Sequence, residues 1–128
     1  MLASSLGWLR EAAAAAYPRE ACGFLVGEEV VEELWPASNG ALEGYRIEDE
    51  EHLLAQHRAR RLGKRILGYY HSHPDGMAVP SRGDHDKAWP DLIYLIIPVW
   101  EGRPGTPRAF RQEKGWLTPC IMPALSPE

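Results

Sequence analysis

The segment HSHPDGMAVPSRGD, residues 71–84, gathers side chains that can coordinate a metal ion. Side chains on a strand alternate between its faces, so His71 and His73 would point to the same side. With Asp84 folded back as a third ligand, they would form a catalytic zinc site that keeps one position open for an activated water. Such a site would be hydrolytic. An HxH pair at a strand end can also be a hydrogen-bonded pair of surface residues, and the pair alone does not decide between the two.

Local patterns predict how this segment is held. The run RILGYYHSH, residues 65–73, is rich in apolar and aromatic residues and predicts a strand that stops at Pro74, because proline cannot continue a central ladder. A loop follows. Ser81, with Asp84 three residues later, is typical of a helix N-cap, and the short helix should run to about Trp89.

The rest of the chain alternates between helical and extended patterns. Expected helices cover residues 4–16 and 47–64, and expected strands cover 22–26, 30–35, 91–99, 108–112 and 115–122, the first two as a hairpin. Interleaved helices and strands predict one α/β domain over residues 1–128, with a mixed sheet covered by helices.

Composition excludes several classes of protein. A net charge of -4 provides no general attraction for nucleic acid, and the bases that end the 47–64 helix complement its dipole. The apolar stretch that begins at Leu92 is too short to cross a bilayer, so no membrane association is expected. Cys22 and Cys120 form no CxxC motif or disulfide framework, which predicts a reduced, cytoplasmic protein with Cys22 as buried packing.

Three further histidines are expected to lie outside the site. His52 and His57 are five residues apart, which does not place them on one helix face, and both are expected at the surface. His85 is expected to face solvent on the short helix. These residues add no ligand to the predicted site.

The motifs resemble those of a known family. HSHP, six residues, then Ser81-Arg82-Gly83-Asp84 resembles the JAMM motif of the MPN-type zinc metalloproteases, and YPREACGFLVG resembles the upstream segment where that family places its glutamate. The order of elements resembles the family along essentially the whole chain. The resemblance implies a deaminase-like α/β/α sandwich with a mixed central sheet. It also implies zinc on His71, His73 and Asp84, with Glu20 as general base and Ser81 as an oxyanion donor. From the residues alone, Glu20 could be a solvated side chain and Ser81 only a helix cap.

The compact chain looks like the prokaryotic type of this family. Members of that type resemble peptidases that cut after the flexible diglycine tail of a small ubiquitin-like or sulfur-carrier protein. Two alternatives stay open: a general small-peptide or amide hydrolase, and a non-catalytic, metal-stabilised interaction module. The presence of Glu20 favours an enzyme, because a structural zinc is usually closed by a fourth protein ligand and needs no base beside it. The oligomeric state is not indicated.

Overall fold

The structure is a computed structural model that describes residues 5–125. Its elements, in chain order, are α1 (Leu6–Ala16), β1 (Cys22–Gly27), β2 (Glu33–Ala37), α2 (Asp49–Arg61), β3 (Arg65–Pro74), α3 (Arg82–Lys87), β4 (Ile93–Trp100), β5 (Arg103–Pro104), β6 (Arg108–Glu113) and β7 (Trp116–Pro119). None of the helices described here is long and apolar enough to span a membrane.

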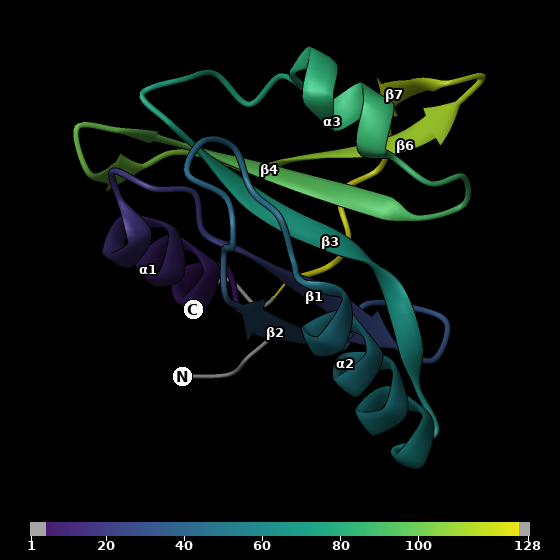
Figure 1. Cartoon of the computed structure of the whole chain (residues 1–128). Coiled ribbons are helices and arrows are strands. Elements are labelled where there is room, and N and C mark those ends of the chain that lie inside the picture. The colour runs from purple at the N-terminus through teal and green to yellow at the C-terminus, as the bar shows by residue number, and fades with distance from the viewer. Residues whose placement is uncertain (1–4, 126–128) are drawn as a thin grey trace.

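The strands form one mixed seven-stranded sheet with the order β2-β1-β3-β4-β6-β7, and β5 pairs with β4 (Figure 1). β3 and β4 run parallel, and the other pairs are antiparallel. Helix α1 packs through Leu9 and Ala13 on one face, whereas α2 packs through Ala55 and Ala59 on the other. The predicted mixed sheet between helices is confirmed.

The helix ends follow from local chemistry. The Ser5 side chain accepts a hydrogen bond from the Trp8 amide and caps α1, so the predicted helix 4–16 begins at Leu6; residue 4 itself lies outside the described residues. Helix α2 has acids in its first turn and bases in its last, and Gly63 follows it with a φ of 71°.

The predicted second strand of the hairpin, 30–35, was placed too early. β2 begins at Glu33, because residues 28–32 form a turn that the Glu32 amide closes by donating to the Val26 carbonyl. At Gly27 a Cβ atom would lie 1.9 Å from the Val30 carbonyl oxygen, so only glycine allows the turn to fold this closely. Pro36 is accommodated because β2 is an edge strand.

Strand β3 carries the histidine motif through the centre of the sheet. It pairs with β1, where Cys22 lies opposite His71, and with β4, where His71 and His73 lie opposite Ile96 and Pro98. The end of β3 is therefore held from both sides. This rigid position is where the predicted site begins.

Candidate active site

The predicted ligand atoms meet at the end of β3. His71 Nε2 and His73 Nε2 are 3.0 Å apart, and Asp84 Oδ2 lies 3.2 Å from the first and 3.0 Å from the second. Asp84 comes from the first turn of α3, which the 75–81 loop folds back over the strand end. The structure thus brings together two imidazoles and a carboxylate that are separated by up to 13 residues.

This triangle suits a small metal ion. Ligand atoms bound about 2.0–2.1 Å from a tetrahedral zinc are roughly 3.3 Å apart, close to the spacing of these three atoms. His73 Nδ1 lies 2.8 Å from the Met77 carbonyl oxygen, which can only accept a hydrogen bond. Nδ1 therefore carries the proton, and Nε2 of a neutral His73 presents a lone pair to the triangle. Nitrogen and oxygen donors of this kind fit zinc.

His71 is held in a different way. Its side chain is fully buried, and burial lowers its pKa, so the ring is kept neutral as a metal ligand must be. Within residues 5–125, its Nδ1 has no hydrogen-bond partner. The Tyr45 ring stacks on the imidazole instead, with centroids 4.5 Å apart and planes 23° from parallel. Stacking therefore orients this ring.

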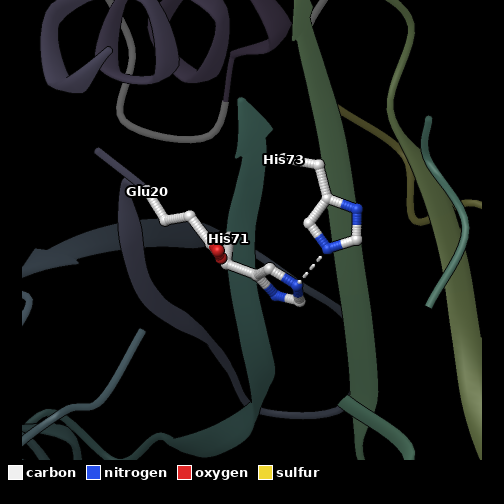
Figure 2. A group of neighbouring side chains, drawn as sticks. All are labelled: Glu20, His71 and His73. Carbon is white, nitrogen blue, oxygen red and sulfur yellow. Dashed lines mark hydrogen bonds between the residues drawn. The ribbon is translucent and has the colours of Figure 1, made fainter. Parts of the chain in front are cut away.

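Glu20 approaches the histidines from the segment before β1 (Figure 2). One of its carboxylate oxygens and one ring nitrogen of each of His71 and His73 lie within 4.8 Å of one another. Burial raises the pKa of Glu20 to about 7, and the nearby Asp84 charge acts in the same direction. A carboxyl that gains and releases a proton near neutral pH suits general acid and base catalysis.

Ser81 and Asp84 form a capping box at the start of α3. The Asp84 amide donates to Ser81 Oγ at 3.1 Å, and the Ser81 amide donates to Asp84 Oδ2 at 2.9 Å. The predicted N-cap is confirmed. Burial by itself would raise the pKa of Asp84, but the contacts of its carboxylate with the His71 and His73 rings, together with the hydrogen bond from the Ser81 amide, outweigh it and hold that pKa well below its usual range. The cap thus fixes a carboxylate that stays ionised.

Two contributors to the site were not predicted. Besides stacking on His71, Tyr45 accepts a hydrogen bond through its carbonyl from Lys87 Nζ at 2.9 Å, which ties the loop between β2 and α2 to α3. Asn39 organises the same loop, because its side chain bonds to Glu20, Ala41, Gly44 and Arg46. The Asn39-Gly40 dipeptide indicates a turn. No periodic pattern indicated that the loop would close over His71.

A groove of about 540 Å³ runs beside the site, and Tyr45 forms part of its wall. Its apolar lining includes Tyr69, Trp89 and Tyr94. His52, predicted at the surface, is half-buried, whereas His57 is exposed as predicted. His52 lies on the same helix face as the buried Ala55 and Ala59, hydrogen-bonds to the Tyr69 hydroxyl and lines this groove.

Two further expectations concern side chains outside the ligand set. His85, predicted to face solvent, is half-buried: its Nδ1 accepts a hydrogen bond from the Leu117 amide at 2.9 Å, and its ring makes a T-shaped contact with Trp116. Cys22 is buried as predicted, and burial raises its thiol pKa to about 12. A thiol in that environment stays protonated and is a poor nucleophile.

Comparison with known proteins agrees with this geometry. The family model for prokaryotic homologs of the JAB domain matches residues 3–113. The chain belongs to this family. This JAB-family chain is 38% identical over 100 residues to the desampylase of Haloferax volcanii, covering 73% of the chain and 72% of the relative. It is 35% identical over 92 residues to a probable TtuB-protein conjugate cleaving protease of Thermus thermophilus, covering 70% of the chain and 59% of that relative's length.

Solved structures share the fold of this chain. A protein from Desulfitobacterium hafniense superposes with a TM-score of 0.83 at 29% identity, covering 99% of this chain and 92% of that one. A JAB1/MPN domain protein from Archaeoglobus fulgidus shares the fold, with a TM-score of 0.60 at 21% identity over 92% of this chain and 94% of its own. The α/β sandwich described above is therefore the fold of this family.

Proposed function

We propose that the protein is a zinc-dependent isopeptidase that hydrolyses the amide bond after the C-terminal diglycine of a small ubiquitin-like or sulfur-carrier protein. The observation that carries the proposal is the convergence of His71, His73 and Asp84 within 3.2 Å of one another, with Glu20 beside the two histidines. The names of the two relatives, a desampylase and a conjugate cleaving protease, support a protein conjugate as the substrate.

Each residue has one chemical task in this proposal. His71, His73 and Asp84 hold the metal ion, which when bound supplies Lewis acidity for activating water and polarising the scissile carbonyl. Glu20 accepts the proton of the attacking water and returns it to the amine that leaves. The Ser81 hydroxyl donates a hydrogen bond to the negative charge that develops on the carbonyl oxygen.

Glu20 is assigned as the base because Asp84 already completes a tight set of three ligands. Asp84 Oδ2 lies 3.0–3.2 Å from both Nε2 atoms, and a Glu20 carboxylate oxygen lies within 4.8 Å of the ring nitrogens of His71 and His73. A carboxylate at this place can reach a water beside the ligands, and its pKa of about 7 suits proton transfer in both directions.

The groove beside Tyr45 supports a flexible peptide tail as substrate. An extended diglycine tail has no side chains at the scissile end, so it can pass a narrow entrance and bind through its backbone. In this proposal, the aromatic lining formed by Tyr69, Trp89 and Tyr94 receives the larger residues that precede the diglycine.

The test is cleavage of a ubiquitin-like protein fused through its C-terminal diglycine to a reporter amine. Zinc-loaded wild type is expected to cut after the diglycine, to lose activity when a chelator removes the zinc, and to regain it when zinc is restored. Glu20→Gln keeps the shape of the side chain but removes its basicity. Its single-turnover rate should fall by about two to four orders of magnitude, with bound zinc and substrate affinity unchanged.

Glu11→Gln, which alters an exposed carboxylate on α1, is the matched control and should cut at the wild-type rate. If Glu20→Gln cuts as fast as this control, Glu20 is not the base. Equal cleavage of a fusion in which both glycines are replaced would contradict diglycine specificity and favour a general peptidase.

A further inference from the structure

Ser72 lies between the two histidine ligands, yet its side chain points away from them. It is fully buried, and strand alternation turns it to the opposite face of β3 from His71 and His73. Its Oγ accepts a hydrogen bond from the Ala21 amide at 2.8 Å, and its own amide donates to the Ala21 carbonyl at 3.0 Å. Ser72 therefore binds the residue that directly follows Glu20.

This pairing departs from a regular antiparallel ladder. Cys22 lies opposite His71, so a continued ladder would place Ala21 opposite Ser72. In a regular hydrogen-bonded pair, each residue donates its amide to the other's carbonyl. Here the Ala21 amide bonds to the serine side chain instead. The chain leaves the sheet at this point, and Glu20 is the first residue beyond it.

The peptide group that joins Glu20 to Ala21 is held at both ends. Its N–H donates to Ser72 Oγ, and its carbonyl, which belongs to Glu20, accepts from Asn39 Nδ2 at 3.1 Å. Rotation of this peptide plane would break both bonds. The plane sets the direction in which the Glu20 side chain leaves the backbone, and that direction leads toward His71 (Figure 2).

We propose that Ser72 is a positioning residue that holds Glu20 in place for proton transfer, through the Ala21 amide. The inference rests on the proposed function, in which Glu20 is the base. Ser72 touches neither substrate nor metal in this scheme. It couples the strand that carries two metal ligands to the segment that carries the base, so both move as one unit.

Removing the hydroxyl should affect rate and not metal binding. Ser72→Ala leaves the strand pairing intact: His71 still pairs with Cys22 and Ile96, and His73 still pairs with Pro98. Both histidines therefore keep their places. The Glu20 peptide loses one of its two anchors. Since a displacement of about 1 Å in a catalytic group costs about 100-fold, we expect kcat to fall by about 10- to 100-fold with KM and zinc content unchanged.

The experiment compares Ser72→Ala, Ser72→Thr and the double variant Glu20→Gln/Ser72→Ala with their parents on the diglycine fusion. Ser72→Thr keeps the hydroxyl and should restore kcat. If Ser72 acts only through Glu20, its removal should not slow Glu20→Gln any further. Amide hydrogen exchange gives a readout without catalysis, because the Ala21 amide should exchange faster in Ser72→Ala.

Ser5→Ala is the matched control. Ser5 is also fully buried, and its Oγ also accepts from a backbone amide, that of Trp8 at 2.9 Å, but it caps α1. The Ser5→Ala variant should therefore be less stable than wild type, with the same kcat.

Three outcomes overturn the inference. The first is a kcat of Ser72→Ala equal to that of Ser5→Ala, and the second is a Ser72→Ala substitution that lowers kcat by the same factor in the Glu20→Gln variant as in wild type. The third is an Ala21 amide that exchanges at the same rate in Ser72→Ala as in wild type. If Ser72→Thr does not fold, the double variant decides alone. A zinc-loaded wild type that cuts no fusion refutes the proposed function itself, and the inference with it. If the wild type cuts the fusion and Ser72→Ala cuts it equally well, only the inference about Ser72 fails and the proposed function stands.

Discussion

The two roles of Ser81 can be separated by one substitution. Its Oγ accepts a hydrogen bond from the Asp84 amide in the cap of α3, which leaves the hydroxyl proton free to donate elsewhere. Ser81→Ala removes both functions of the hydroxyl. The second bond of the capping box, from the residue 81 amide to Asp84 Oδ2 at 2.9 Å, does not involve the side chain of residue 81 and remains. Asp84 should therefore stay in position, and zinc content should not change.

The two roles predict effects of different size. Loss of a serine cap costs about 1 kcal/mol of stability. A domain that starts with roughly 5–15 kcal/mol stays more than about 99% folded after that loss, so capping alone cannot lower kcat measurably. Loss of an oxyanion donor costs about 100- to 1,000-fold in kcat. We expect Ser81→Ala to lose about 1 kcal/mol in urea unfolding and about 100-fold or more in kcat, with KM nearly unchanged.

Ser5→Ala again provides the comparison, because it removes the cap of α1 and the hydrogen bond from the Trp8 amide at 2.9 Å. Both variants should unfold at lower urea concentration, but only Ser81→Ala should be slow on the diglycine fusion. If Ser81→Ala loses stability and keeps kcat within about twofold of wild type, Ser81 is a helix cap only, and the oxyanion donor must be sought elsewhere.

The remaining predictions concern the metal and the thiol. His73→Ala removes one of three proposed zinc ligands together with its hydrogen bond to the Met77 carbonyl, so the purified variant should contain little zinc by elemental analysis; full occupancy would contradict the ligand set. Cys22→Ala should keep kcat within about threefold, because burial raises the Cys22 pKa to about 12 and leaves little thiolate. Loss of turnover in a folded, zinc-loaded Cys22→Ala variant would favour thiol catalysis.

Features that depend on short sequence patterns were predictable. The alternation of a strand placed His71 and His73 on one face, and the three-residue spacing of Ser81 and Asp84 produced a capping box. The acidic start and basic end of α2 located that helix closely. In each case, the residues that determine the structure lie within a single element, at most 12 positions apart, so no knowledge of distant contacts was needed.

Features that depend on distant contacts were not predictable from the residues alone. Tyr45 stacks on His71, 26 positions away, only because Asn39 folds the loop before α2 and Lys87 holds it to α3. His52 is half-buried because it shares a helix face with Ala55 and Ala59, which its five-residue spacing to His57 does not indicate. Glu20 could be assigned only by resemblance: the local sequence places it just before the strand that begins at Cys22, but nothing in it indicates that the side chain turns toward His71 and His73.

The metal ligands and the base are held in place in different ways, so substitutions near each should have different effects. His71 and His73 are embedded in β3 between β1 and β4, so their geometry follows from the ladder itself. Glu20 lies where the chain leaves the sheet, and its direction depends on single hydrogen bonds, from Ala21 to Ser72 and from Asn39 to Glu20. Disruption of the ladder near the histidines should cost zinc and activity together. Disruption of the hydrogen bonds around Glu20 should cost rate while zinc stays bound, because proton transfer is more sensitive to small displacements than metal binding is.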